Sequence, residues 1–181
     1  GTTIHDAWRQ VCVRYARDVP SLLKYCCVAA ICDGANNRLG TVFTPYPYFY
    51  AWNKADDADR VSNGIGSLYT LVKGAFAPER FLAIVRDFVF YPDDGDKEIV
   101  CRYPQFFAAT KMLDSICAHL RPSGDGKGGT YFGATGCGKT YTMLFLSRLM
   151  MLRRSSVLGN PTIVIIVDRE DLDSQTSELF V

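Results

Sequence analysis

The sequence predicts an α/β fold built on a parallel sheet, and three observations predict it. Apolar residues recur at helical intervals between residues 103 and 120, as in an amphipathic helix. The β-branched run Thr162–Val167 has the composition of a strand buried on both faces, which is typical of parallel sheets. Between these segments, a short apolar stretch, a glycine-rich loop and a second helical pattern follow one another in the order strand, loop, helix.

The overall composition describes a globular chain without a strong electrostatic field. The chain has 181 residues, of which 48% are hydrophobic, and this is enough to bury a core. Its 20 Lys and Arg residues against 19 Asp and Glu residues leave a formal charge of +1, so any nucleic-acid surface must be local. No apolar stretch approaches the roughly 20 residues of a membrane span, and the first residues lack the pattern of a secretion signal. We therefore expect a cytoplasmic protein without a membrane partner.

The cysteines do not form a metal-binding pattern. There are seven of them, no C-x-x-C pair occurs, and only two histidines accompany them. We expect no zinc site and interpret the cysteines as small core side chains that are kept reduced in a cytosol.

The first part of the chain predicts a helix, a strand and an extended segment. Residues 6–25 mix apolar and charged positions at helical spacing and are broken at Pro20, and the run Cys26–Cys32 predicts a buried strand that ends in a turn. Residues 36–40, Asn-Asn-Arg-Leu-Gly, have the composition of a turn. Residues 41–52 are rich in aromatic residues and contain prolines, which favours an edge strand or an extended loop over a central strand.

The middle of the chain predicts helices joined by polar connectors. Residues 56–72 indicate a loop and a short helix, and Pro78 opens a helix with an apolar face behind its first turn. The polar run 92–96 is the best candidate for a boundary between two structural units. The helical pattern over 103–120 then stops before Pro122.

The remaining segments surround the glycine-rich motif. Residues 123–129 predict a loop, residues 130–132 a short strand, and residues 139–153 a helix. Asn160-Pro161 breaks the chain again before the strand predicted at 162–167. The motif between the first strand and the helix therefore has the setting of a phosphate-binding loop.

The segment Gly133-Ala-Thr-Gly-Cys-Gly-Lys-Thr140 matches the pattern G-x-x-x-x-G-K-[ST] at every fixed position. Glycines let backbone N–H groups curl around phosphate oxygens, and the helix that begins near Lys139 adds a partial positive charge. We expect Lys139 to reach the β and γ phosphates and the Thr140 hydroxyl to bind Mg²⁺. The residues assigned to nucleotide binding in this loop are Gly133, Thr135, Gly136, Cys137, Gly138, Lys139 and Thr140.

Cys137 occupies one of the free positions of the motif. A thiol close to phosphate-binding amides and to Lys139 can be unusually acidic. We favour the simpler interpretation, in which Cys137 is a tolerated small side chain.

Four stretches around the loop resemble the R subunit of type I restriction enzymes. They are Trp52-Asn-Lys-Ala-Asp56, Ser62-Asn-Gly-Ile65, Tyr103-Pro-Gln105 and Asp168-Arg-Glu-Asp-Leu-Asp-Ser-Gln175, and the match extends from about Ala7 to Val181. That family joins a nuclease of the PD-(D/E)-x-K class to a superfamily 2 helicase-like motor of two RecA-like lobes.

The resemblance implies a fold and a domain order. Residues 1–52 would be the end of an α/β restriction-nuclease-like domain, and residues 53–96 a linker and helical connector. Residues 97–181 would be the start of the first RecA-like ATPase lobe, with the P-loop on its parallel sheet.

The resemblance also implies a function. The chain would be an ATP-binding fragment of the restriction subunit, which couples ATP hydrolysis to DNA translocation and endonucleolytic cleavage as an ATP-dependent type I site-specific deoxyribonuclease. Its cofactors would be ATP and Mg²⁺. Its partners would be DNA and the methylase and specificity subunits of the restriction complex.

Further residues take roles from the resemblance. Gln105 precedes the loop by about a helix length, as does the adenine-reading glutamine of many superfamily 2 motors; the alternative is a surface glutamine at a helix start. Residues 168–175 correspond to motif Ia of such motors, where Arg169 would contact the DNA backbone or form an ion pair within the lobe. A competing interpretation makes the apolar strand ending in Asp168, with Glu170 nearby, a Walker B strand that holds Mg²⁺ through water.

We expect no complete catalytic site in this chain. A motor needs a Walker B acid pair and an arginine from the second lobe, and neither occurs before Val181, so we expect ATP binding without efficient turnover. The (D/E)-x-K match Asp125-Gly-Lys127 lies in a glycine-rich loop and is interpreted as coincidence. The family's nuclease carries a Gln and a Tyr four residues apart on a helix, whereas Gln10 and Tyr15 are five apart, which on an α-helix turns Tyr15 by about 100° from the expected face.

Two alternatives remain open. One is another superfamily 2 motor, such as a type III restriction subunit or a remodelling ATPase, against which the Trp52-Asn53-Lys54 stretch speaks. The other is a non-catalytic nucleotide-binding module whose nucleotide stabilises a docking surface. ATP turnover that DNA stimulates would indicate a motor.

Overall fold

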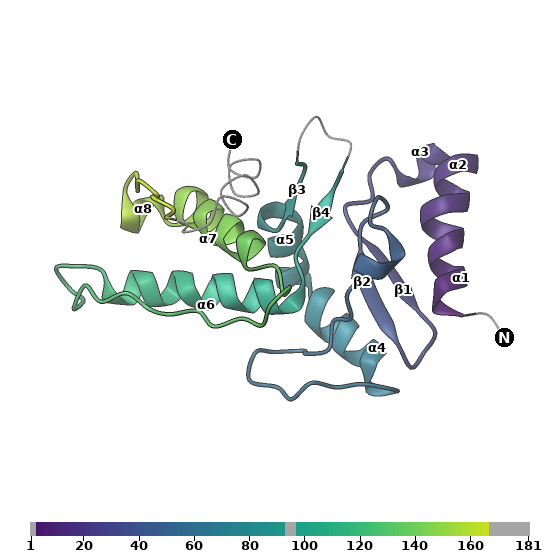
Figure 1. Cartoon of the computed structure of the whole chain (residues 1–181), viewed down its shortest axis with the longest axis horizontal. Helices are drawn as coiled ribbons and strands as arrows, with labels where there is room; N and C mark the ends of the chain where they lie inside the picture. The colour runs from purple at the N-terminus through teal and green to yellow at the C-terminus, as the bar shows by residue number, and fades with distance from the viewer. Residues whose placement is uncertain (1–2, 93–96, 167–181) are drawn as a thin grey trace. The chain divides into compact units, whose positions relative to one another are not determined.

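A computed structural model describes residues 3–92 and 97–166, and the chain divides into two compact units, Gly1–Tyr103 and the part that begins at Pro104 (Figure 1). The elements of the first unit are α1 (Ile4–Trp8), a π-helical stretch (Arg9–Tyr15), α2 (Ala16–Asp18), α3 (Pro20–Leu23), β1 (Ala29–Cys32), β2 (Asn37–Gly40), a 3-10 turn (Tyr46–Tyr48), α4 (Gly66–Thr70), a second π-helical stretch (Leu71–Ala75), α5 (Pro78–Asp87), β3 (Val89–Phe90) and β4 (Ile99–Val100). Helix α6 (Tyr103–His119) leads into the second unit, which contains α7 (Lys139–Arg153) and α8 (Ser155–Leu158). The domain boundaries at residues 52 and 96 stay predictions.

The first helix begins where its sequence provides a cap. The Thr3 side chain accepts a hydrogen bond from the Asp6 backbone, and the Asp6 carboxylate accepts one from the Thr3 N–H at 2.8 Å, which forms a capping box. The helix continues from α1 to α2 and starts again as α3 at Pro20, as the sequence predicts. Its apolar side packs on β1, where Ala29 and Ile31 form a buried cluster (Figure 1).

Strands β1 and β2 form an antiparallel hairpin, in a register that pairs Ala29 with Gly40 and Cys32 with Asn37. The prediction of a turn at 36–40 is wrong from Asn37 onward. The turn lies earlier, where Gly34 has a φ of 91° and the Asp33 carboxylate accepts hydrogen bonds from the backbone N–H groups of residues 35 and 36. The strand predicted at 26–32 is confirmed from Ala29 to its end.

Residues 41–52 form an extended loop rather than a central strand, as predicted. Its prolines accompany the 3-10 turn Tyr46–Tyr48, and an isolated antiparallel bridge joins Tyr50 to Leu39 at the edge of the hairpin. The Thr41 hydroxyl donates to the Glu98 carbonyl oxygen at 2.8 Å, which ties the start of this loop to the segment before β4.

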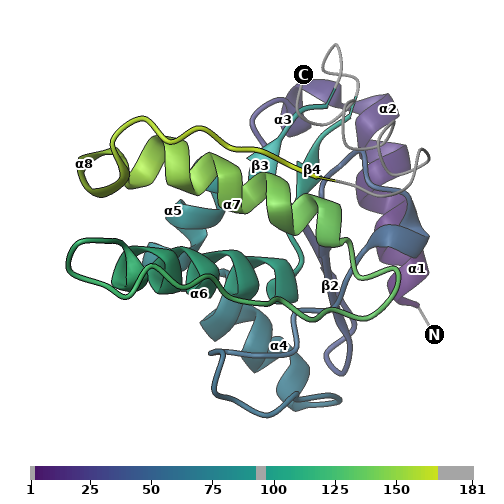
Figure 2. The same cartoon turned by 60° about the vertical axis from the view of Figure 1, so that its left-hand side comes forward.

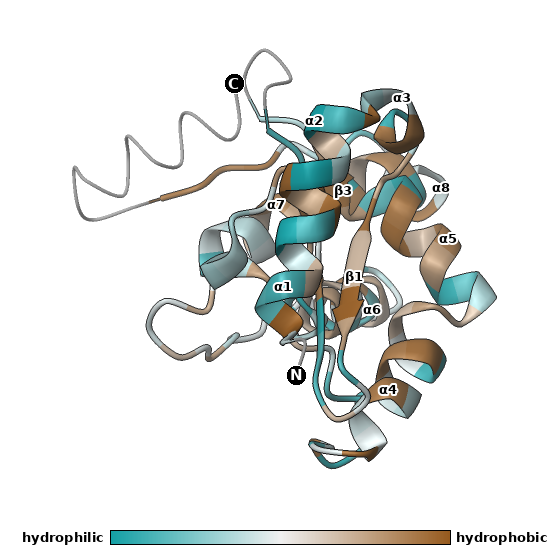
Figure 3. Cartoon of the chain, turned by 90° about the vertical axis from the view of Figure 1, so that its right-hand side faces the viewer, coloured by the Kyte–Doolittle hydropathy of each residue, from teal (hydrophilic) through white to brown (hydrophobic). Residues whose placement is uncertain are grey.

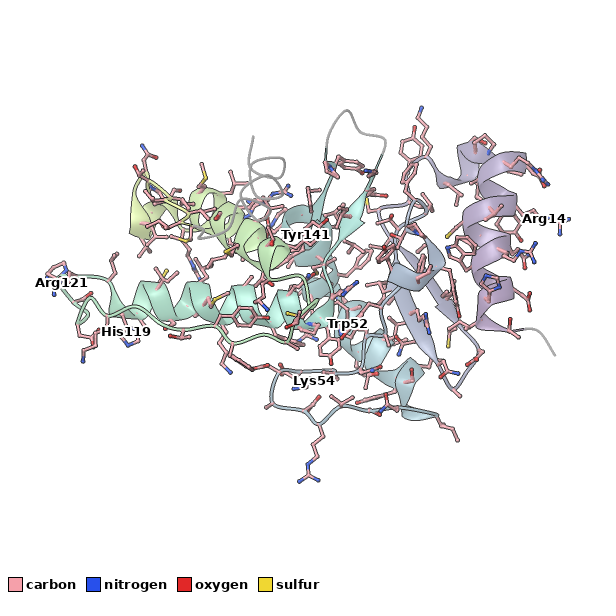
Figure 4. All side chains as sticks on the ribbon, in the orientation of Figure 1. Arg14, Trp52, Lys54, His119, Arg121 and Tyr141 are labelled. Carbon is pink, nitrogen blue, oxygen red and sulfur yellow. The ribbon has the colours of Figure 1, made fainter. Side chains whose placement is uncertain are left out.

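Buried polar side chains join the hairpin to the helix that follows. The Asn37 amide accepts a hydrogen bond from the Trp52 N–H at 2.8 Å and donates one to the Ser67 carbonyl oxygen at 2.7 Å. The Thr70 hydroxyl donates to the Trp52 carbonyl oxygen at 2.9 Å. Trp52 is 1% exposed, and Figure 4 shows it inside the unit, with Lys54 at the start of the loop beyond. This network fixes the Trp52 stretch by its backbone.

Helix α4 and the π-helical stretch after it carry an exposed apolar face. Ile65, Leu68, Tyr69 and Val72 recur at helical spacing, and all four side chains are exposed. Figure 3 shows α4 largely in the colours of apolar residues. The short helix expected within 56–72 is therefore present, with Ser67 and Thr70 on its buried side.

Helix α5 begins at Pro78, as predicted, because proline fits the first turn, where no backbone donor is required. The short strands β3 and β4 pair in antiparallel fashion after it, Val89 with Val100 and Phe90 with Ile99. The polar connector predicted between them lies largely outside the described residues, which omit 93–96.

In the second unit, α6 and α7 lie side by side and run in the same direction (Figures 1 and 2). Two contacts agree with this arrangement: Gln105 at the start of α6 meets Gly138 before α7, and Asp114 further along α6 meets Arg154 just after α7. Both helices have the bounds that the sequence predicts to within about one residue. At the far end of α6, His119 and Arg121 lie by the turn that leads into the glycine-rich loop (Figure 4).

Within the described residues, the segments predicted as strands beside the phosphate loop are not strands. Residues 130–132 and 162–166 form no strand, and Val167 lies outside the described residues. A strand needs a hydrogen-bonded neighbour, and neither segment has one within 3–92 or 97–166; Phe132 and Ile166 are 93% and 89% exposed. The fold class is therefore confirmed as α/β with small sheets. The two sheets of this part of the chain are antiparallel pairs, and the parallel P-loop sheet is not confirmed.

No helix in the described part of the chain is both long and apolar enough to cross a membrane.

Candidate nucleotide-binding loop

The loop before α7 has the backbone that its glycines predict. Gly136 and Gly138 have φ angles of 77° and 81°, in the left-handed region that favours glycine. Gly138 is the N-cap of α7, and no side chain caps the helix there. The N-terminus of this 15-residue helix therefore opens on the loop without an N-cap side chain, which is the arrangement of an anion site.

Lys139 lies exposed at this loop. Its ammonium group donates hydrogen bonds to the carbonyl oxygens of Gly133 and Ala134, at 2.9 and 3.1 Å. The side chain therefore folds back over the first half of the loop. Thr135 and Gly136 are also exposed, and Thr140 is half-buried in the first turn of α7.

Gln105 meets the second half of the loop. Its side chain is 4% exposed, and Nε2 lies 3.4 Å from the Cys137 carbonyl oxygen and 3.2 Å from that of Gly138. A Cβ atom at Gly138 would overlap this nitrogen. The structure thus brings Gln105 and the loop together, while its predicted contact with adenine stays a prediction.

Tyr131 and Thr142 also adjoin the loop, and both were missed in the sequence. A Cβ atom at Gly133 would lie 2.8 Å from the Cys137 sulfur and 3.1 Å from the Tyr131 hydroxyl. Burial raises the pKa of Tyr131 above its usual value, and the neighbouring Cys137 adds to this. The Thr142 side chain is fully buried and donates to the Gly138 carbonyl oxygen at 3.3 Å. Thr142 could have been found from its position on the inner side of the first turn of α7.

The pair Gln10 and Tyr15 corrects an expectation based on α-helical geometry. The two side chains are hydrogen-bonded at 2.6 Å, so Tyr15 is not turned away from Gln10. The reason is the π-helical stretch Arg9–Tyr15, because the backbone hydrogen bonds of a π-helix join residues five apart rather than four. The five-residue spacing therefore still brings the two side chains together.

The candidate nuclease and metal groups that the structure describes are not gathered into a centre. Lys127 and Asp125 make a local ion pair at 3.3 Å within their loop. Among residues 3–92 and 97–166, no group of three or more His, Cys, Asp and Glu side chains is placed to hold a metal ion. The seven cysteines are free thiols, and burial raises the pKa of Cys12 to about 11.

The segment assigned to motif Ia lies outside the described residues. This includes Asp168, Arg169 and Glu170. The three interpretations of these residues, as a DNA contact, an ion pair or a Walker B strand, therefore remain predictions.

Comparisons with known proteins agree with the loop and extend beyond it. The family model described as SWI2/SNF2 ATPase matches residues 104–181. The type I restriction enzyme HindI endonuclease subunit of Haemophilus influenzae is 29% identical over 92% of this chain and 16% of its own length. The MjaIXP endonuclease subunit of Methanocaldococcus jannaschii, named for a type I restriction enzyme, is 26% identical over 91% of this chain and 17% of its own length.

A further relative matches a shorter part of the chain at higher identity. The MjaVIIP type I endonuclease subunit of the same archaeon is 37% identical over 57% of this chain and 10% of its own length. No solved structure matches. The chain spans about one sixth of the length of the first two relatives. The resemblance expected from the sequence is confirmed: over about nine tenths of its length, the chain is similar to the endonuclease subunits of type I restriction enzymes, with an ATPase-like region from residue 104.

Proposed function

We propose that this chain is the ATP-binding part of the DNA-translocating endonuclease subunit of a type I restriction–modification system. The observation that carries the proposal is the glycine loop 133–140, which has two left-handed glycines and an uncapped helix directly behind it. The relatives named as endonuclease subunits support it, and so does the ATPase model that matches the same residues.

The loop offers the groups that a triphosphate requires. Backbone amides from Gly133 to Lys139, together with the N-terminus of α7, would hold the phosphate oxygens. The Lys139 ammonium already lies over the loop, where it would exchange the carbonyl oxygens of Gly133 and Ala134 for the β and γ phosphates. The Thr140 hydroxyl would be a ligand of Mg²⁺, which neutralises phosphate charge when it is bound.

DNA translocation and cleavage belong, in this proposal, to the whole endonuclease subunit together with the methylase and specificity subunits. The support is the length of the relatives, of which this chain matches about one sixth. Arg169 is our candidate for a contact with the DNA backbone, because a guanidinium group suits phosphate.

Calorimetric titration with Mg²⁺-ATP tests the phosphate loop. Lys139→Ala should weaken binding by about a hundredfold or more, because each charge-assisted hydrogen bond to a phosphate contributes roughly 1.5–3 kcal/mol. Lys127→Ala is the matched control, since Lys127 is exposed and pairs only locally with Asp125 in the contacts described above. Equal affinities for the wild type and Lys139→Ala would refute the proposal.

An ATPase assay with and without duplex DNA separates the alternatives. Turnover that DNA stimulates would support a motor, whether of this family or another of superfamily 2. ATP binding without turnover fits an incomplete motor or a nucleotide-stabilised docking module. The match of the relatives to residues on both sides of Tyr103 favours the restriction subunit over a motor related only through its ATPase region.

A further inference from the structure

Gln105 and the phosphate loop approach each other more closely than the motif alone requires. The Gln105 side chain is buried at the start of α6, and its amide nitrogen lies 3.4 and 3.2 Å from the carbonyl oxygens of Cys137 and Gly138. On the loop side, Gly138 leaves no Cβ atom in the way. Both partners therefore contribute to the contact, one through a buried donor and the other through a missing side chain.

This contact helps to set the direction of two peptide groups, and the Gly138 carbonyl oxygen also accepts hydrogen bonds from the Thr142 N–H and hydroxyl at 3.2 and 3.3 Å. The peptide bonds after Cys137 and Gly138 are trans, so the N–H of each following residue points away from the carbonyl oxygen of the same peptide. When these oxygens face Gln105, the N–H groups of Gly138 and Lys139 face the opposite side. Those amides are among the donors that a phosphate loop directs at its anion.

We propose that Gln105 is a positioning residue for the phosphate loop, which orients the Gly138 and Lys139 amides toward the bound phosphates. The proposal rests on the proposed nucleotide function and names a different task from adenine recognition. The amide nitrogen that holds the two loop carbonyls would have to leave them in order to donate to an adenine nitrogen. Gln105 acts through the loop and touches no reacting atom in this role.

The two tasks are separated by a ligand that has phosphates and no base. Gln105→Met keeps the length of the side chain in its buried site and removes the donor. Mg²⁺-tripolyphosphate, Mg²⁺-ATP and Mg²⁺-GTP would each be titrated calorimetrically into the wild-type chain and the variant. We expect the variant to bind all three about tenfold more weakly, with the ratio of ATP to GTP affinity unchanged, because the loss lies in the loop.

A second measurement reports on the loop without any ligand. Amide hydrogen exchange at residues 137–140 should become faster in Gln105→Met, while thermal unfolding and helix content stay close to those of the wild type. Gln10→Met is the matched control: Gln10 is exposed and bonds to Tyr15 in the first unit, so it should change neither exchange at 137–140 nor tripolyphosphate affinity.

The outcomes distinguish the inference from the proposed function. If the wild type binds neither tripolyphosphate nor ATP, the nucleotide function fails, and the inference fails with it. If the wild type binds and Gln105→Met retains full tripolyphosphate affinity, only the inference is overturned. A loss confined to ATP, with tripolyphosphate and GTP unchanged, would instead show that Gln105 reads adenine.

Discussion

The two units of the chain hold their loops in different ways. In the first unit, buried side chains bond to backbone groups far away in the sequence, as Asn37 does to Trp52 and Thr41 to Glu98. In the second unit, the bonds of the phosphate loop that the structure shows are mostly local, and Gln105 provides a long-range contact. Long-range bonds fix a backbone in one conformation, whereas local ones leave a loop free to exchange partners with a ligand.

The burial of apolar side chains also differs between the two units. The first unit buries Trp52, Phe88 and Ile84 almost completely. Around the phosphate loop, Phe132 and Ile166 are almost fully exposed, in segments whose composition predicts strands. The stretch around Trp52, which carries part of the resemblance to restriction subunits, therefore has a structural role, whereas the proposed nucleotide binding lies in the loop.

Replacing Asn37 should have the largest effect on the first unit. Asn37→Leu keeps a similar volume but leaves the Trp52 N–H and the Ser67 carbonyl oxygen without this partner in a buried site. We expect a loss of roughly 3 kcal/mol in the free energy of unfolding, because the Trp52 N–H loses this acceptor at a buried site, which costs about 1–3 kcal/mol; the Ser67 carbonyl oxygen can still accept from the Thr70 hydroxyl at 2.8 Å. Denaturant unfolding followed by tryptophan fluorescence reports on this unit alone, since Trp8 and Trp52 both lie in it.

The same variant tests how separate the two units are. If the phosphate loop depends only on contacts within its own unit, tripolyphosphate affinity should be unchanged in Asn37→Leu under conditions where the chain stays folded. Asn63→Leu, at an exposed position of the first unit, is the control and should change stability by less than about 0.5 kcal/mol. A parallel loss of affinity in Asn37→Leu would contradict the contrast between the units.

Gly74→Ala should have the next largest effect. A Cβ atom there would overlap the Trp52 ring and lie 2.6 Å from the Lys54 carbonyl oxygen, and backbone yields less readily than a flexible side chain. We expect a loss of about 2 kcal/mol by denaturant unfolding, as is typical of an overpacked core. Gly128→Ala in the second unit is the control, since a Cβ atom at Gly128 would meet nothing within 4 Å. Equal stabilities of the two variants would mean that the Trp52 site can relax.

Helices of this chain could be predicted from the sequence because their signals are local. Pro78 marks the start of α5, Pro122 follows the end of α6, and Gly138 precedes α7. The glycine conformation of the loop could be predicted for the same reason, because its motif is contiguous. The strands predicted beside the loop are not formed at residues 130–132 and 162–166, because a strand depends on a neighbour that may lie anywhere in the chain and that composition does not reveal.

Other features could not be predicted from the sequence, because the same residue type or spacing occurs in two different structures. Asparagine is typical of turns, yet the side-chain amide of Asn37 is buried and hydrogen-bonds to a distant segment at Trp52. Gln10 and Tyr15 are spaced incorrectly for one face of an α-helix and correctly for one face of a π-helix, and nothing in the sequence distinguishes the two. The contact of Gln105 with the loop depends on how α6 packs beside α7.

The smallest expected effect on stability concerns Glu98, a buried carboxyl of the first unit whose charged form opposes folding. Burial raises the pKa of the Glu98 carboxyl above its ordinary value of 4.5, and the hydrogen bond from the Tyr91 hydroxyl at 2.9 Å offsets this only in part. The same bond is the main reason that the pKa of Tyr91 is raised to about 12. The folded chain therefore binds the Glu98 proton more tightly than the unfolded chain does.

The sign of the pH dependence follows from this difference. The contribution of Glu98 to stability is fully present below pH 4.5 and is lost as the pH rises through the raised pKa, because the charged carboxylate is disfavoured in its buried site. Glu98→Gln stays neutral and can still accept the Tyr91 hydrogen bond, so it should match the wild type below pH 4.5 and be more stable at pH 7 in thermal unfolding. Tyr91→Phe removes the stabilising donor and should steepen the loss in the wild-type background. If Glu98→Gln were less stable than the wild type at pH 7, the charged carboxylate would stabilise the first unit, and the prediction would be wrong.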